Sequence, residues 1–244
     1  MSIKNKVFAA AATLTLVGGA SAMGALTAGT ASAATPSCGD SCVEFFSAEF
    51  SNNGFPNFVL DTLRQGEKVG QPQILFRTSD TDPAEDYTIS DQGLVSDFYA
   101  AGLVSPEVDL HYGGGVAGFP DDEAWEVQYS PYGVDSGLCT GVAATAVAGE
   151  KVTLQPCGVS SKTLWIIDSY DTIAHGYVPL INGSDTNFSQ PFVLTYPASA
   201  YPTDTPRPEL YVTNLTGSQG ANGLPFPGTV NSNQLFGVDF GVES

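Results

Sequence analysis

The chain has 244 residues, with 26 Asp and Glu against 8 Lys and Arg and a formal net charge of −18. Charged residues make up only 14% of the chain and hydrophobic residues 42%, which predicts a folded core and excludes a disordered acidic tail. So large an excess of negative charge repels nucleic-acid phosphates and anionic lipid surfaces. We therefore expect no nucleic-acid partner and no membrane partner.

Residues 1–33 have the organisation of a removable export signal. Lys4 and Lys6 precede an uncharged apolar stretch, and Ala31-Ser32-Ala33 supplies the small residues of a signal-peptidase site. The alternative is a retained membrane anchor, but three glycines interrupt the stretch and favour cleavage. We expect a secreted, extracellular protein in which residues 34–244 form a single domain.

Short segments with a side-chain period of two predict an all-β chain, since one face of a half-buried strand is apolar and the other polar. Trp125, Val127 and Tyr129 alternate in this way with polar residues. The 27 glycines and 16 prolines are typical of tight turns between strands. Further strands are expected at residues 43–50, 57–63, 73–78, 87–90, 151–155, 164–168, 177–181, 192–196, 210–214 and 236–240.

One short segment favours a helix. Asp97–Ala101 follows Ser96, a suitable N-cap, and precedes Gly102, which favours helix termination. No segment has helical periodicity over three turns, so we expect little helix.

Aromatic residues in the expected strands recur at intervals of about 40 residues, which indicates an internal repeat. They are Tyr87, Trp125, Trp165 and Tyr211, and a second set is Phe58, Leu138 and Val178. Three such units predict a β-trefoil, in which each unit supplies two barrel strands and one hairpin that caps the barrel.

The units are expected to begin near Asn57, Gly137 and Gly176, which leaves residues 92–133 as a long insertion. The strand around Trp125 fits this division poorly. A count of four units is the alternative, and it would favour another β-barrel or a β-sandwich.

Four cysteines in an exported chain are an even set and predict disulfides. Cys139 and Cys157 lie in neighbouring strands of the middle unit, and a bridge between them would contribute about 3 kcal/mol to stability. Cys38 and Cys42 would then pair locally near the mature N-terminus. The other pairings stay open, as does metal binding by the short pair, although no second pair has zinc-site spacing.

The middle unit resembles one repeat of the ricin B-type lectin family. The resemblance covers Ser136-Gly-Leu-Cys-Thr-Gly-Val-Ala, Gly149-Glu-Lys-Val-Thr-Leu-Gln-Pro-Cys and Leu164-Trp-Ile-Ile. It is much weaker in the other two units. The whole chain resembles small secreted actinomycete proteins to which no activity is assigned, so that likeness carries over no chemistry.

The lectin resemblance implies a β-trefoil that binds sugars in shallow pockets, with a carboxylate or amide for the hydroxyls and an aromatic face for the ring. The middle unit has Gly141 and Gln155 where the family has the acid and the aromatic, so it implies a structural copy only. In the last unit Asn182 and Tyr196 fall on these two positions.

In the first unit Asp61 takes the acidic position, but Arg77 stands where the aromatic should be. The resemblance therefore implies ligand-binding residues Asn182, Tyr196 and Asp61. The alternative for each is a structural residue: a turn Asn, a core-edge Tyr and a surface Asp.

Other chemistry has little support in the sequence. His111 and His175 are the only histidines, and no nucleophile elbow accompanies them. Two acidic groups, residues 80–86 and 121–123, offer oxygens for Ca²⁺ or a carboxylate pair for hydrolysis, but neither has EF-hand spacing. Motifs for nucleotides, haem and zinc proteases are missing. We expect no cofactor, no metal and no enzymatic activity.

The leading hypothesis is a secreted, monomeric, non-catalytic binding protein for a neutral carbohydrate, with its site at Asn182 and Tyr196. The alternative is an extracellular protein-interaction module, such as a protease inhibitor. In that case the insertion 92–133, with Phe119-Pro-Asp-Asp-Glu, would be the contacting loop.

Overall fold

The computed structural model describes residues 38, 42–50, 58–79, 82–115, 120–158, 160–167, 176–217 and 230–240. The expected export signal, residues 1–33, lies outside them, as do Asn57, Asp80, Phe119 and His175. The described residues belong to one compact unit within 35–244. In this part of the chain, no helix has the length and apolar character needed to cross a membrane.

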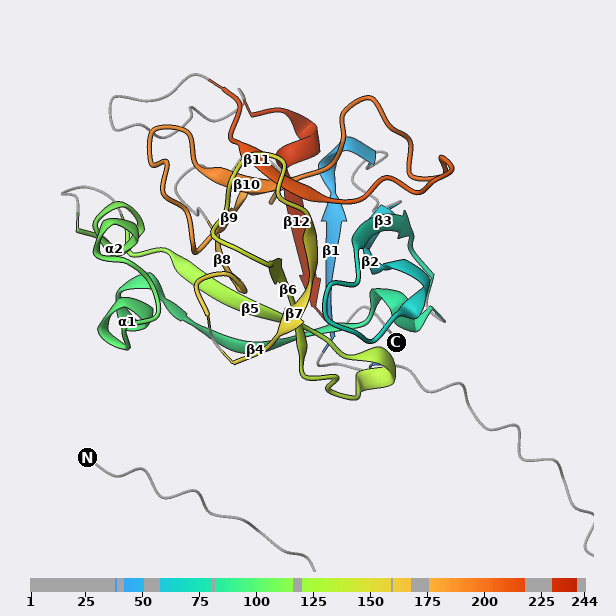
Figure 1. The fold of residues 1–244 in the computed structure, drawn as a ribbon, viewed down its shortest axis with the longest axis horizontal. Helices are drawn as coiled ribbons and strands as arrows, with labels where there is room; N and C mark the ends of the chain where they lie inside the picture. Colours follow the sequence, from blue (N-terminus) through green and yellow to red (C-terminus); the bar gives the residue numbers. More distant parts are fainter. Residues whose placement is uncertain are drawn as a thin grey trace, which may run out of the picture. The chain divides into compact units, whose positions relative to one another are not determined.

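The described residues form an all-β fold with little helix, as expected (Figure 1). Twelve strands are found in them: β1 (Val43–Ser47), β2 (Phe58–Thr62), β3 (Gln73–Arg77), β4 (Tyr87–Leu94), β5 (Glu123–Tyr129), β6 (Leu138–Val142), β7 (Val152–Pro156), β8 (Leu164–Ile167), β9 (Leu180–Asn182), β10 (Phe192–Thr195), β11 (Tyr211–Asn214) and β12 (Phe236–Phe240). Single-turn 3₁₀-helices lie at Ala48–Phe50 (η2), Leu63–Gln65 (η3), Pro83–Glu85 (η4), Pro131–Gly133 (η5) and Ser232–Gln234 (η6).

Six of the strands close into a barrel. β1 pairs with β4, β4 with β5, β5 with β8, β8 with β9, and β12 with β1, all antiparallel. The remaining gap, between β9 and β12, is bridged at Val178 and Phe236. The ring is therefore complete and exposes no free sheet edge.

The other six strands form three hairpins, β2–β3, β6–β7 and β10–β11. Single β-bridges join each hairpin to the other two: Pro72 to Thr153, Ile74 to Glu209, and Lys151 to Tyr211. A closed six-stranded barrel capped by three mutually bridged hairpins is a β-trefoil, so the predicted fold is confirmed.

Equivalent positions of the three units fill the barrel interior. The first strands supply Phe45, Val127 and Leu180, and the second strands supply Leu60, Thr140 and Leu194. The fourth strands supply Tyr87, Trp165 and Phe236, which are all buried. Of the four aromatic residues that indicated the repeat, Tyr87 and Trp165 occupy equivalent positions.

The predicted division into units is wrong in its boundaries. The units are β1–β4, β5–β8 and β9–β12, so the strand of Trp125 is the first strand of the second unit. Relative to the other two units, the predicted third unit began one strand too early. The residue equivalent to Tyr87 and Trp165 is therefore Phe236 instead of Tyr211. All strand types have the same period of two, so periodicity alone does not say which strand begins a unit.

The insertion is shorter than expected and contains two helices. It lies between the end of β4 and the start of β5, and holds α1 (Val95–Ala100) and α2 (Pro106–Tyr112). α1 overlaps the expected helix but begins two residues earlier, so Ser96 lies within it and is not its N-cap, and α2 was missed. Its N-terminus has Pro106 in the first turn and the Ser105 hydroxyl as a cap, accepting a hydrogen bond from the Val108 N–H at 3.2 Å.

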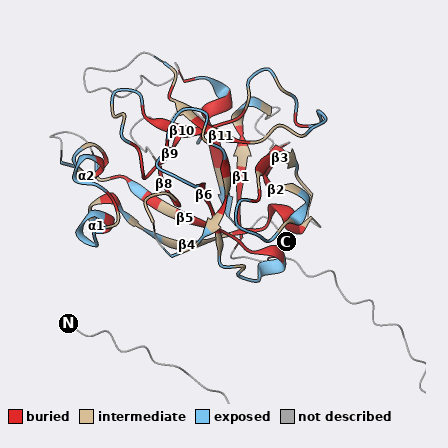
Figure 2. Cartoon of the chain, viewed as in Figure 1, coloured by how far each residue is buried: buried red, intermediate tan, exposed pale blue. Residues whose placement is uncertain are grey.

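The helices pack against the outer face of the barrel at β8 and β9. Val95, Phe98 and Val108 belong to a second buried cluster with Ile166 and Ile181. Burial on both sides explains why β8 reads as the continuous apolar run Leu164-Trp-Ile-Ile. Figure 2 shows that α1 exposes residues on its side away from the barrel. The two helices of the insertion thus form a packed layer, whereas Phe119 of the proposed contacting loop lies outside the described residues.

Both predicted disulfides are present. Cys139 and Cys157 join the β6–β7 hairpin with a Cα–Cα separation of 5.0 Å, and Cys38 and Cys42 are 5.7 Å apart. These separations are ordinary for disulfides. Among the described residues no cysteine is left free.

A candidate binding pocket beside the first hairpin

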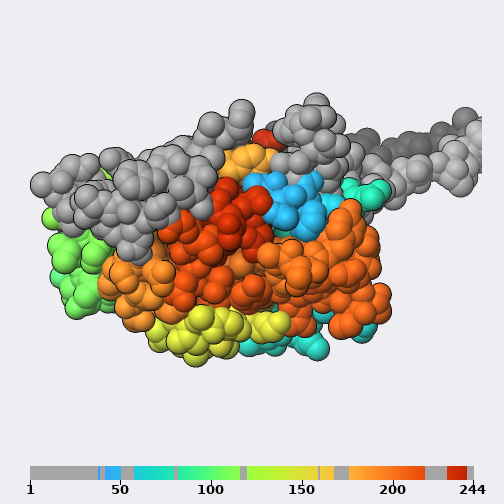
Figure 3. Space-filling view, turned by 90° about the horizontal axis from the view of Figure 1, so that it is seen from above, coloured from blue at the N-terminus to red at the C-terminus, as the bar shows by residue number. Residues whose placement is uncertain are grey.

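A hollow of about 560 Å³ lies between the β2–β3 hairpin and the segment that leads into β11. Its charged and aromatic lining is formed by Asp61, Arg64, Phe76, Asp82, Arg207 and Glu209. In Figure 3 the orange segment between β10 and β11 lies beside the teal atoms of the first unit. The volume is within the range of small-ligand pockets.

Asp61 is the most unusual residue of this hollow. It lies on β2 opposite Ile74, its exposed fraction is 3%, and it borders the hollow. No residue of the described chain donates a hydrogen bond to its carboxyl group. Burial raises its pKa to about 8, with a further contribution from Asp82 that Arg207 opposes. At neutral pH this carboxyl group is therefore mainly protonated and has a hydrogen bond to donate.

The other two acids of the hollow already have partners. Asp82 Oδ1 accepts hydrogen bonds from the Ala84 N–H and from Gln65 Nε2, each at 3.0 Å. Glu209 lies 3.3 Å from the ammonium group of Lys151. Asp61 is thus distinguished from them by its burial and by its lack of a partner.

Phe76 and Arg207 form one wall of the hollow. The guanidinium carbon of Arg207 lies 4.3 Å from the centre of the Phe76 ring, a cation–π contact. Nη1 of Arg207 donates a hydrogen bond to the carbonyl oxygen of Pro202 at 2.6 Å. These two contacts fix the guanidinium over the ring.

The strand pairing within the three hairpins shows which residues of the other units are equivalent to the residues that line the hollow. Asp61 pairs with Ile74, Gly141 with Thr153, and Thr195 with Tyr211, so Asp61, Gly141 and Thr195 are equivalent. By the same pairing Phe76 is equivalent to Gln155. The sequence comparison that placed Arg77 at the aromatic position is therefore wrong by one residue. The first unit combines the acid and the aromatic side chain that the lectin resemblance implies.

The structure places Asn182 in the core. Its exposed fraction is 0%. Its Nδ2 donates to the carbonyl oxygen of Lys162 at 3.1 Å, and its Oδ1 accepts from the hydroxyl of Ser184 at 2.6 Å. With its hydrogen bonds satisfied in this way, the side chain fixes a turn and does not reach a ligand.

Tyr196 is also fully buried, with its ring 5.2 Å from that of Phe50. Burial raises the pKa of its hydroxyl group above the usual value. It belongs to the main hydrophobic core. Asn182 and Tyr196 are therefore both buried, and they were placed at the ligand positions because the predicted third unit was displaced by one strand.

The remaining candidate groups have structural roles. His111 stacks on Phe188 with ring centres 4.4 Å apart. Asp121 accepts a hydrogen bond from the Ser96 N–H, Glu85 from the Ser79 N–H, and Asp86 from the Tyr132 N–H. These acids, from the two acidic groups considered for Ca²⁺, therefore each have a separate backbone partner.

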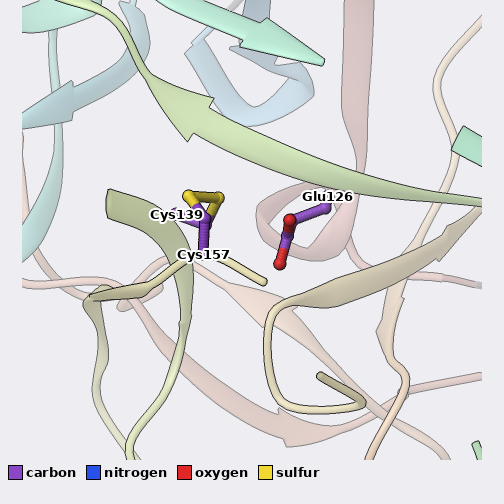
Figure 4. Close-up of side chains that lie close together, drawn as sticks. All are labelled: Glu126, Cys139 and Cys157. Atoms are coloured by element: carbon purple, nitrogen blue, oxygen red, sulfur yellow. A yellow bond between two sulfur atoms is a disulfide. The ribbon is translucent and has the colours of Figure 1, made fainter. Parts of the chain in front are cut away.

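One group of potential metal ligands is close together in the described residues: Glu126, Cys139 and Cys157 (Figure 4). The two sulfur atoms are joined in a disulfide, so they offer no thiolate to a metal. Glu126 accepts a hydrogen bond from the Thr163 hydroxyl at 2.6 Å. This group therefore stabilises the middle unit.

No protein-family model and no curated protein match the chain. Similar solved structures include the designed three-fold symmetric protein ThreeFoil (11% identity, 82% of this chain and 98% of that chain, TM-score 0.49). Another is an exo-β-1,3-galactanase from Clostridium thermocellum (10% identity, 82% of this chain and 30% of that chain, TM-score 0.48). At such low similarity neither indicates a function, and the fold assignment stands on the strand pairing.

Proposed function

We propose that the protein is a secreted, non-catalytic carbohydrate-binding protein whose site is the hollow lined by Asp61, Phe76 and Arg207. The observation that carries this proposal is the carboxyl group of Asp61, which is buried, faces the hollow and has no partner in the described chain. Because this carboxyl group borders the hollow, a ligand hydroxyl group placed there could form a hydrogen bond with it.

The chemistry of the lining supports a ligand rich in hydroxyl groups. A protonated carboxyl group donates and accepts hydrogen bonds, a guanidinium donates, and a hydroxyl group can complement both. The resemblance of the middle unit to ricin B-type repeats supports the same interpretation, since the first unit has an acid and an aromatic side chain at the two relevant positions. The site proposed from the sequence thus moves from the last unit to the first.

The lining also supports a binding role without catalysis. Hydrolysis of a glycosidic bond requires two carboxyl groups that flank the bond. Asp82 is held by the Ala84 N–H and Gln65, and Glu209 by Lys151, so both acids have structural contacts that favour a binding role for the hollow.

A glycan array followed by titration calorimetry on the best ligand tests the proposal. Asp61→Leu and Phe76→Ala should each reduce the affinity at least 10-fold, because they remove the unpartnered carboxyl group and the support of Arg207. Gln155→Ala, the equivalent of Phe76→Ala in the middle unit, is the matched control and should bind like the parent. Unchanged binding by Asp61→Leu, or the lack of any bound glycan, would refute the proposal.

A further inference from the structure

We propose that the saccharide bound in this hollow carries a carboxylate, as a uronic acid does, and that Arg207 binds this group. The inference rests on the proposed carbohydrate site and specifies its ligand class. It replaces the neutral glycan expected from the sequence.

The first argument is the distribution of positive charge. Beyond residue 33 the chain has only six Lys and Arg against 26 Asp and Glu. Arg64 and Arg207 line the hollow, and Lys151 pairs with its Glu209. Two of the six scarce cations therefore line one hollow of a strongly acidic protein, while Lys151 offsets one of its acids, Glu209.

The second argument is the state of the Arg207 side chain. Stacking on Phe76 and the hydrogen bond to Pro202 hold the guanidinium in place, and its other N–H groups have no partner in the described chain. A planar guanidinium matches a carboxylate with two parallel hydrogen bonds. Since the side chain is already ordered, binding a carboxylate would lose little further rotamer entropy.

The third argument concerns the aromatic ring. A neutral sugar is favoured by an open aromatic face that contacts its C–H groups. The Arg207 guanidinium covers the face of Phe76 at 4.3 Å, so the hollow presents a cation at the place of an apolar platform. This arrangement favours a charged group over a plain sugar ring.

The two arginines of the hollow outnumber the one acid that no neighbouring charge offsets. Asp61 on β2 is mainly protonated, with a pKa of about 8, and would donate a hydrogen bond to the ligand. Glu209 is paired with Lys151, whereas Asp82 at the start of η4 accepts hydrogen bonds from two neutral groups, Ala84 N–H and Gln65 Nε2. Above pH 8 the ionised Asp61 would repel a carboxylate, and binding should weaken.

Calorimetric titration with matched sugar pairs tests the inference. The probes are glucuronate against glucose, galacturonate against galactose, and mannuronate against mannose, at pH 6 and pH 9. We expect one acidic sugar to bind at least 10-fold more tightly than its neutral counterpart at pH 6, and this preference to shrink at pH 9. Asp61→Asn should make the preference independent of pH.

Two variants isolate Arg207. Arg207→Gln should abolish the preference for the acidic sugar, and Arg207→Lys should keep part of it. Arg77→Gln is the control, because Arg77 is exposed and points away from Phe76 along the alternating strand. Thermal melts establish that each variant is folded.

The outcomes separate the two proposals. If a neutral glycan binds at the Asp61 hollow and no acidic sugar exceeds its neutral counterpart, the inference fails while the proposed function stands. If neither these sugars nor any glycan on the array binds, both fail. A preference that survives in Arg207→Gln would overturn the role of Arg207.

Discussion

The first and the middle units of the trefoil have equivalent strands, but they differ in the space beside their hairpins. In the middle unit Gly141 has no side chain, and a Cβ atom at this position would lie 2.6 Å from the Lys162 carbonyl oxygen. In the first unit the equivalent residue is Asp61, which faces a hollow. In the middle unit the Lys162 backbone therefore occupies this space, whereas in the first unit the space is open.

The middle unit also differs from the other two in the residue that lies just before the fourth strand. In the first unit the Glu85 carboxylate accepts a hydrogen bond from the Ser79 N–H at 2.6 Å, and in the third unit Gln234 accepts one from the Thr216 N–H at 2.8 Å. The middle unit has the shorter Thr163 at this place. Glu126 reaches in from β5 instead and accepts from the Gly158 N–H and the Thr163 hydroxyl.

The resemblance to the lectin family is clear in the middle unit, whereas the proposed binding site lies in the first unit. The middle unit resembles the lectin repeat because it keeps the cysteines and the tryptophan of that repeat. The first unit lacks those residues, yet it holds the unpartnered carboxyl group. Residues that specify folding are therefore a poor guide to where a ligand binds.

Removal of the middle disulfide should have the largest effect on stability. The Cys139→Ala, Cys157→Ala double variant loses a bridge that closes the β6–β7 hairpin, and we expect a loss of about 3 kcal/mol. The melting temperature, measured by calorimetry, should fall by roughly 6–12 °C. The Cys38–Cys42 bridge closes a shorter loop, so the Cys38→Ala, Cys42→Ala variant should lose less stability. An equal or greater loss in this control would contradict the expectation that the longer loop contributes more.

Introduction of the missing acid into the middle unit should destabilise it instead of opening a site. Gly141→Asp places side-chain atoms against the Lys162 backbone, and overpacking of this kind costs about 2 kcal/mol. Chemical denaturation measures the loss, and Gly141→Ala should show a smaller part of it. A stable Gly141→Asp variant that binds an additional sugar would show that the middle unit can open.

The smallest expected effect concerns Glu85. Burial raises its pKa to about 9, with Glu44, Asp61 and Asp82 contributing. Between pH 4.5 and 9 the folded chain keeps a proton that the unfolded chain releases, so the free energy of unfolding should fall as pH rises through this window. Asp61 adds the same trend up to about pH 8.

Glu85→Gln copies the side chain that the third unit has at this position. The amide keeps an acceptor for the Ser79 N–H and removes the buried ionisable group. We expect the variant to be more stable than the parent by about 1 kcal/mol at pH 8, with a smaller difference at pH 5. Parallel stability profiles for the two proteins, measured by denaturation from pH 5 to 9, would argue against a protonated Glu85.

The strands were predictable because a period of two, bounded by glycine and proline, depends on local sequence alone. α2 was not, because its seven residues, Pro106–Tyr112, show little periodicity and its cap at Ser105 is a weak signal by itself. The unit boundaries also escaped, since they depend on which strands meet in the barrel.

The site was predictable only in part. Asp61 could be named from the lectin resemblance, but its burial and lack of a partner are properties of the folded chain. Phe76 was missed by one residue of strand pairing. Arg207 lies in the connection between β10 and β11, far from Asp61 in the sequence, and no local pattern links the two.

The two walls of the hollow come from the first and the third units, residues 61–84 and 205–209. A nascent chain that has emerged only as far as the middle unit contains Asp61 but not Arg207. If the proposed site is correct, binding would therefore require the third unit to have folded against the first. Ligand capture would then report that synthesis and folding have gone to completion.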